Sequence, residues 1–561
     1  MSKNKIIVLS DIHIGTNVST VWYQKDIHEP YLVTILDWIV ENANSIQELI
    51  LLGDVVDFWT YPPEEEPPGF DKIIKANPAL FDEDGKLSRV LTALDGKVTY
   101  VHGNHDMSIT QADLDKIKNS QGYKIRLHSE DIYYPKSNGS KEIACTHGHI
   151  YTMFNAPYLP EPNVNNPIAP LPLGQLITRS VAFERSKELA NGQNVAQLKD
   201  SGDPDSKKLL SSALPDLEKA IIPLLRGENP HLSIPEIILN TISRATGMSE
   251  TQVIKLPGGK KTTLEEGKKI YANLWSQWQK KEGTSNAIKS ILADTALDDG
   301  FLGGFAQKLA QDVGAKLVVM GHTHKPISGI VGSPTGYVNT GFNCPSTVDL
   351  ANNSKNATFV EIDIEACQAK VLKVVEENSF YNIKPCPAQS VESKTEIKIG
   401  EYKIKLDFDP NKALDQIIKI ATSDAKFIIE VANKTKYELQ CVGVKNDSGT
   451  WTLQNIPANT SIQEPVNCNM NINTFSLAAN YRVENGSGFV QLAASWPAAG
   501  QRKINVGNID QDGSTPAEEV WSKMEDPSDK SCSNNSVEVR AFIQAKEKGK
   551  TIIWFYEVTQ K

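Results

Sequence analysis

Five short clusters of aspartate, asparagine and histidine occur along the first 324 residues of the chain. In chain order they are Asp11-Ile12-His13, Gly53-Asp54-Val55-Val56-Asp57, Gly103-Asn104-His105-Asp106, His147-Gly148-His149 and Gly321-His322-Thr323-His324. Imidazole and carboxylate groups together suit Mn, Fe, Co, Ni or Zn, whereas Mg and Ca favour oxygen ligands alone. A single cluster of this kind more often forms a turn or caps a helix than binds a metal. The set of five predicts a transition-metal site, provided that the fold brings the clusters together.

Each cluster directly follows a short apolar run of the kind that forms a buried strand. The runs cover residues 6–10, 49–52, 98–101, 143–145 and 317–320. Continuous apolar runs of this length are typical of strands that are covered on both faces. In α/β sheets, ligands bind just beyond the carboxyl ends of the strands. We therefore expect an α/β domain in which the five clusters converge in one crevice.

The order D-x-H, GD-x-x-D, GNH-D/E, H and GH-x-H resembles the signature of the calcineurin-like metallophosphoesterase superfamily. This resemblance covers about the first 375 residues apart from an insertion, and it implies an α/β (α+β), four-layer sandwich of two sheets flanked by helices. It also implies two metal sites that share Asp54 as a bridging ligand. One site takes Asp11, His13, Asp54 and His324, and the other takes Asp54, Asn104, His147 and His322.

The resemblance further implies hydrolysis of a phosphomonoester or a phosphodiester by a metal-bound hydroxide. Two divalent transition-metal ions can activate water and stabilise the oxygens of an in-line displacement. Manganese is the expected metal, with Fe, Zn, Co or Ni as alternatives. His105 is expected to be the general acid, and Asp106 is expected to hold its imidazole. Asp57 either orients a ligand from the second shell or caps a helix.

A long segment, about residues 151–315, separates the fourth and fifth clusters. Its apolar spacing predicts helices near residues 177–192, 207–227 and 265–281, so we expect a helical cap over the site. Arg179, Arg185 and Lys187 on the first of these helices could meet phosphate or lie solvated. Aromatic residues near the clusters, including Trp59 and Tyr151, could flank the metals or pack in the core.

The first domain is predicted to end near residue 375, and residues 376–395 are predicted to form a linker. Beyond it, from residue 396 to 561, short alternating apolar runs separated by Asn, Gly, Ser and Pro predict a β-rich domain, either an antiparallel sandwich or a barrel. About 120 residues of this domain are faintly similar to aegerolysin and actinoporin-like β-sandwiches, which bind membranes. The domain contains no histidine, so it is not expected to supply metal ligands.

An alternative function is a lipid- or membrane-associated phosphoesterase that the C-terminal domain directs to its substrate. The region from Asp54 to Trp59 and the helical insertion resemble UDP-diacylglucosamine hydrolases, but those enzymes typically carry Arg where this chain has His105. The C-terminal part can also be interpreted as a structural interaction domain. Membrane lipid is the expected partner only if the protein is a membrane-associated phosphoesterase.

The bulk composition excludes some classes of partner. A net charge of −10 and a pI near 5.6 disfavour nucleic acid as a partner. The seven cysteines are scattered without a CxxC pair, which is typical of reduced thiols. No apolar stretch reaches the roughly 20 residues of a membrane span, and no signal peptide is evident, so we expect a cytoplasmic protein. The sequence specifies neither the substrate nor the oligomeric state.

Overall fold

The computed structural model describes residues 3–561 except 137, 159–170, 191–232, 296–299, 332, 342–356, 392–393, 400–401, 408–425, 449–453, 467–474, 497–501, 525–528 and 547–550. The chain divides into two compact units. Most of the described chain up to Thr395 belongs to the first, and the described residues from Glu396 onward, together with Glu282–Ser285, belong to the second. The predicted helix at 207–227 falls outside the described residues.

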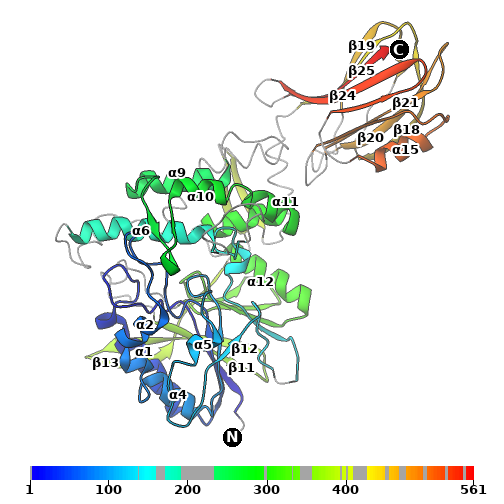
Figure 1. Ribbon diagram of the computed structural model, residues 1–561. Coiled ribbons are helices and arrows are strands. Elements are labelled where there is room, and N and C mark those ends of the chain that lie inside the picture. The colour runs from blue at the N-terminus through cyan, green and yellow to red at the C-terminus, as the bar shows by residue number, and fades with distance from the viewer. Residues whose placement is uncertain are drawn as a thin grey trace. The chain divides into compact units, whose positions relative to one another are not determined.

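Two facing sheets form the centre of the first unit (Figure 1). The first has the order β13-β12-β11-β1-β2-β3-β4, in which β1 to β4 are parallel and β11 to β13 are antiparallel. Its strands are β1 Lys5–Leu9, β2 Ile46–Leu52, β3 Val98–Val101, β4 Arg126–His128, β11 Thr358–Asp363, β12 Gln368–Glu377 and β13 Phe380–Pro385. The second has the order β14-β9-β10-β8-β5. Its strands are β5 Ile143–Cys145, β8 Leu317–Met320, β9 Ile327–Ile330, β10 Gly336–Asn339 and β14 Gln389–Val391.

The apolar runs predicted as strands are buried because side chains cover both faces. One core cluster joins the two sheets and contains residues such as Val8, Ile50, Val101, Ile143 and Val319. The opposite face of the first sheet packs against helices, which are α1 Lys25–Glu41, α2 Phe70–Ala76, α3 Pro78–Phe81, α4 Lys86–Ala93 and α5 Gln111–Leu114. Helix α12 (Gly300–Val313) packs on β8 and β10. The predicted layered α/β sandwich is therefore confirmed.

The insertion between β5 and β8 is mainly helical where it is described. Helices α6 (Leu173–Ala190), α9 (Ile234–Thr246) and α10 (Leu264–Ile270) pack together, and Figure 1 shows them grouped above the core elements. Ser233 and Glu236 form a capping box at the start of α9. The insertion also contains η1 His149–Tyr151, β6 Ile254–Lys255, η2 Pro257–Gly259, β7 Lys261–Thr262 and α11 Leu274–Thr295.

Residues 376–395, predicted as a linker, are largely part of the first unit, and the sequence prediction is wrong here. Strand β12 extends to Glu377, β13 pairs with it, and β14 pairs with β9 at the edge of the second sheet. Polar residues and prolines are tolerated in these strands because both lie at sheet edges. Exposed Phe380 lies on β13, the outermost strand of the first sheet. Beyond them, β15 Lys394–Ile399 and β16 Tyr402–Asp407 pair with each other.

The second unit is a β-sandwich. One sheet has the order β19-β17-β25-β24-β23 and the other β18-β20-β21-β22, and a shared core including Phe427, Phe475, Trp496 and Trp554 joins them. Its elements are β17 Lys426–Lys434, β18 Leu439–Ser448, β19 Thr460–Pro465, β20 Phe475–Val483, β21 Phe489–Trp496, β22 Lys503–Gly507, α15 Thr515–Ser522, β23 Lys530–Ser533, β24 Val537–Lys546 and β25 Thr551–Gln560. The predicted β-rich domain is confirmed, although β17 and β25 pair in parallel.

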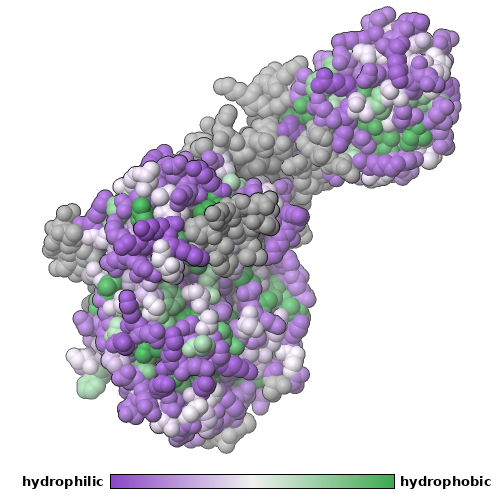
Figure 2. Space-filling model, viewed as in Figure 1, coloured by the Kyte–Doolittle hydropathy of each residue, from purple (hydrophilic) through white to green (hydrophobic). Residues whose placement is uncertain are grey.

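On the face shown in Figure 2, hydrophobic residues are scattered among hydrophilic ones. Among the helices that the structure describes, none combines the length and the hydropathy that a membrane crossing requires.

Candidate metal centre

The five clusters lie at the carboxyl ends of β1, β2, β3, β5 and β8, as the sequence predicts. Five of their residues have positive φ angles between 51° and 73°, although none is a glycine: Asp11, His13, Asp54, His322 and His324. Such a conformation is uncommon for residues other than glycine, although Asp and His adopt it more often than most, and it is retained where surrounding structure fixes it. Through these conformations the short loops after β1, β2 and β8 turn several polar side chains towards a common region.

Glycines allow these loops to approach one another closely. A Cβ atom on Gly103 would collide with the carboxylate of Asp54, and one on Gly321 would collide with Ser10 and Asp11. Gly53 has φ +80°, and a Cβ there would collide with the backbone of Gly103. Gly53, Gly103 and Gly321 are each the first residue of a cluster. They are required because the loops lie too close together to leave room for a Cβ atom.

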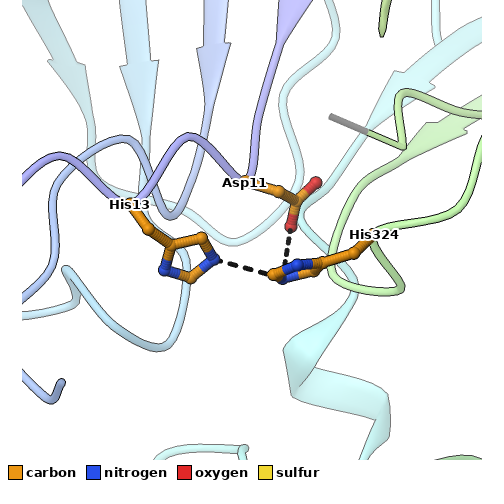
Figure 3. A group of neighbouring side chains, drawn as sticks. All are labelled: Asp11, His13 and His324. Carbon is orange, nitrogen blue, oxygen red and sulfur yellow. Dashed lines mark hydrogen bonds and ion pairs between the residues drawn. The ribbon is translucent and has the colours of Figure 1, made fainter. Parts of the chain in front are cut away.

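Asp11, His13 and His324 form the first group of potential ligands (Figure 3). Nε2 of His324 lies 3.1 Å from Nε2 of His13 and 3.7 Å from Oδ1 of Asp11. Asp11 and His13 are fully buried, whereas the side chain of His324 is 17% exposed. The backbone N–H of His322 donates to Oδ1 of Asp11 at 2.7 Å, which ties β1 to the loop after β8.

Asp54, His147 and His322 form the second group. Oδ2 of Asp54 lies 3.1 Å from Nε2 of His147 and 3.8 Å from Nε2 of His13, so this carboxylate lies between the two groups. Nδ1 of His322 is 3.1 Å from Oδ1 of Asn104. All seven predicted ligands therefore meet in one place, and Asp54 has the position predicted for a bridge.

The chemistry of these side chains fits divalent cations. Nδ1 of His147 bonds to the carbonyl oxygen of Leu52 at 2.8 Å, which leaves Nε2 directed at the carboxylates. That buried Nε2 lies close to Asp54 without the alignment of a hydrogen bond. Burial opposes the charged imidazole, but Asp54 and then Asp11 raise the pKa of His147 to about 9. The same negative field would stabilise a cation held by these residues.

Asp57 connects the first group to His105. Its Oδ2 accepts from Nδ1 of His13 at 2.8 Å and from Nδ1 of His105 at 3.0 Å. Its Oδ1 accepts the backbone N–H groups of Trp59 and Thr60, so the carboxylate both orients side chains and caps a turn. Burial opposes ionisation, but His105, by charge and by hydrogen bonding, holds the pKa of Asp57 well below its usual range.

Asp106 does not hold the imidazole of His105 as predicted, although its charge is among the causes that raise the pKa of that imidazole. Its carboxylate accepts from the backbone N–H groups of Gly103 and Val55, at 2.7 and 2.8 Å, and from the hydroxyl of Tyr100. These bonds direct it away from the imidazole of the adjacent His105, which bonds to Asp57 instead. Asp106 therefore fixes the loops after β2 and β3. Burial would lower the pKa of His105, but Asp57 and Asp54 together raise it.

Several residues that support the site were not predicted. Ser10 and Thr340, both fully buried, hydrogen-bond to Oδ2 of Asp11, and the side-chain amide of Asn339 donates to the carbonyl of Gly321. Asn339 is the last residue of β10 and Thr340 follows it, so polar residues at the end of an apolar strand were a signal that could have revealed them. The ring of Trp22, for which the sequence gives no such signal, contacts the rings of His13, His105 and His324.

The neighbouring histidines His102 and His149 have structural surroundings. His102 bonds to the carbonyl of Ile109 at 2.7 Å. His149 packs beside His147, with ring centroids 5.4 Å apart. Burial, followed by the charge of His147, lowers the pKa of His149 to about 3, so its imidazole stays neutral at pH 7.

Arg179 connects the insertion to the loop that follows Asp57. Its Nη2 donates to the carbonyl oxygens of Pro62, Glu65 and Lys255, at 2.7, 2.6 and 3.1 Å, and the side chain is fully buried. The glycine-rich turn 257–259 contacts the same loop, because the N–H groups of its two glycines bond to the carboxylate of Glu66. Arg179 is one of the three basic residues that the sequence suggested for phosphate binding. In the structure its guanidinium contacts backbone carbonyl oxygens instead.

Comparison with known proteins finds a family model that matches the N-terminal part of the chain. Residues 4–176 match the family model described as calcineurin-like phosphoesterase. The matched segment contains the first four clusters and ends before His322. A solved structure of a dimetal phosphatase from Danio rerio is 10% identical, with 69% of this chain and 96% of that chain covered, but the TM-score of 0.25 is too low to support an argument. No curated protein matches the chain.

Proposed function

We propose that this chain, a phosphoesterase hydrolase with a calcineurin-like phosphoesterase region at residues 4–176, hydrolyses a phosphomonoester or phosphodiester with two divalent transition-metal ions, manganese being the expected pair. The observation that carries the proposal is the pair of ligand groups on either side of Asp54, with His105 held next to them. One ion would be held by Asp11, His13, Asp54 and His324, and the other by Asp54, Asn104, His147 and His322.

Two bound ions would supply Lewis-acid chemistry, which activates water and stabilises the charge that develops at phosphorus. The protein contributes the orientation of the ligands. Asp57 accepts from Nδ1 of His13, and Leu52 accepts from Nδ1 of His147, so in both rings Nε2 is the nitrogen that faces the site. Preset imidazole tautomers of this kind raise the affinity of a site for a metal.

His105 is the side chain that we propose as the general acid. Its Nδ1 is engaged by Asp57 at 3.0 Å, so Nε2 is the atom that can give a proton to the oxygen of the leaving group. Packing fixes the ring as well, because Trp59 lies beside it with centroids 4.4 Å apart. A fixed acid next to the metal ligands suits an ester with a poor leaving group, for which protonation matters most.

A substrate panel tests this function. Protein loaded with Mn would be assayed against phosphomonoesters and phosphodiesters, with Asp54→Asn as the control. The proposal expects turnover of at least one class by the wild type and none by the variant. Equal activity of the variant, or no turnover with Mn, Fe or Zn, contradicts it.

For the C-terminal sandwich we propose a role outside the chemistry, because its described residues contribute to none of the ligand groups. Recruitment of an interaction partner is the simplest such role, and membrane lipid is the alternative. Co-sedimentation of the protein with liposomes of mixed composition separates the two, since a protein-recruiting domain would stay in the supernatant.

A further inference from the structure

Trp22 lies in the loop between β1 and α1 and packs directly on the proposed site. Its ring centroid is 4.6 Å from that of His13, 5.0 Å from His105 and 5.4 Å from His324. The indole is half-buried, and part of it packs against the core cluster around the first sheet. The ring therefore touches two potential metal ligands and the proposed acid while part of it stays accessible.

Four of the other aromatic residues near the clusters are more buried than Trp22, whereas Phe58 and Tyr151 are half-buried as it is. Phe58 packs against the core cluster around the first sheet, and Tyr151 stacks on Phe305. Trp59, Tyr61, Phe154 and Tyr158 are between 0% and 4% exposed, so each serves as core. Trp59 contacts the ring of His105, but its burial leaves no surface for a ligand. Within the described part of the chain, Trp22 thus combines contact with three site histidines and an accessible surface.

We propose that Trp22 forms one wall of the leaving-group side of the site and selects esters whose leaving group is a flat aromatic alcohol. This inference rests on the proposed function. His105 would protonate the leaving oxygen, so the group attached to that oxygen must lie next to the His105 ring. The indole of Trp22 borders the same ring and offers a planar surface there. Offset or edge-to-face packing of two aromatic rings improves recognition by roughly threefold to tenfold.

A purely structural role of Trp22 gives a different pattern. If the indole only held His13 and His324 in place, its removal would weaken metal binding and would slow every ester equally. If it contacts the leaving group, its removal leaves the metals bound and changes the ratio between aromatic and aliphatic esters.

The test uses full-length protein loaded with Mn and two phosphoesters, one aromatic and one aliphatic, matched in charge and in the acidity of the leaving alcohol. Trp22→Leu removes the ring but keeps apolar volume, and Trp22→Phe restores an aromatic surface. Trp38→Leu is the matched control, because Trp38 is also half-buried but packs on Phe359 away from the site. Metal content and the binding of phenylphosphonate and methylphosphonate, measured by calorimetry, accompany kcat/KM.

The inference expects the wild type and Trp38→Leu to favour the aromatic ester and phenylphosphonate. Trp22→Leu should reduce that preference roughly threefold to tenfold at unchanged metal content, and Trp22→Phe should recover most of it. An unchanged preference in Trp22→Leu overturns the inference and leaves the proposed function intact. An equal loss for both esters together with loss of metal also overturns it. A wild type that turns over neither ester contradicts the proposed function itself.

Discussion

Oδ2 of Asp57 lies 3.0 Å from Nδ1 of His105, although the two residues belong to loops that follow different strands. The same oxygen also accepts from His13, so a single carboxylate orients a potential metal ligand and the proposed acid. Two hydrogen bonds from backbone N–H groups hold the other oxygen in place. The orientation of a potential metal ligand and that of the proposed acid therefore both depend on the fully buried carboxylate of Asp57.

This coupling predicts different outcomes for two neighbouring carboxylates. Asp57→Asn weakens the bonds to both imidazoles and should lower kcat by about 10²-fold or more, in the range that general acids contribute. Asp106→Asn should act mainly on stability, at a cost of roughly 1–3 kcal/mol, because a buried N–H group loses its acceptor. Steady-state kinetics and urea unfolding of both variants measure the difference. A larger kinetic defect in Asp106→Asn than in Asp57→Asn would refute the assignment.

His105→Ala should retain both metals and lower kcat by roughly 10²–10⁴-fold for esters with poor leaving groups. Esters with good leaving groups need little protonation and should be affected much less. The measurement is a plot of log kcat against the pKa of the leaving alcohol, which should become steeper in the variant. Parallel plots would show that His105 does not act as the acid.

Gly321→Ala should damage the first ligand group, because a Cβ atom there would collide with Ser10 and Asp11. The expected result is weaker metal binding and a loss of roughly 1–3 kcal/mol of stability, as for overpacking in a core. Gly69→Ala is the control, since a Cβ at that position meets no atom within 4 Å. Metal titration and thermal unfolding compare the two, and equal behaviour would contradict the close approach of the loops.

The position of β13 and β14 predicts where the chain can be shortened. A protein that ends after Thr395 keeps both sheets of the first unit, so it should bind metal and turn over a small phosphoester at the full-length rate. One that ends at Val375 loses both edge strands and should aggregate or unfold more readily. Analytical gel filtration and activity assays compare soluble fractions. If the longer form is well folded but has lost most turnover, the C-terminal unit completes the site.

The sequence predicted the strands, and the polar clusters that the fold brings together, because both depend on local patterns. Each of the five apolar runs has strong strand character, and each ends at a polar cluster, so position along the chain sufficed to identify residues such as Asp11 and His147. The family resemblance supplied the pairing into two sites. Neither step required knowledge of how loops from different strands touch.

The sequence-based predictions failed where contacts between segments distant in the sequence determine the structure. Asp106 is adjacent to His105 in sequence, but the turn directs its carboxylate to backbone N–H groups, and Asp57 from another loop reaches the imidazole. The segment 376–395 looked like a linker because edge strands tolerate polar residues and proline. Trp22 precedes α1 without any motif, so only the fold reveals that its ring touches three histidines of the site.

Metal stoichiometry tests the central claim most directly. Protein loaded with Mn and freed of excess ions by gel filtration should contain two ions per chain by elemental analysis and should hydrolyse a phosphoester. Asp54→Asn, which alters the carboxylate between the two ligand groups, should contain fewer ions and should show no turnover. A wild-type protein that retains no Mn, Fe or Zn, or an Asp54→Asn variant that keeps two ions and full activity, would contradict the account.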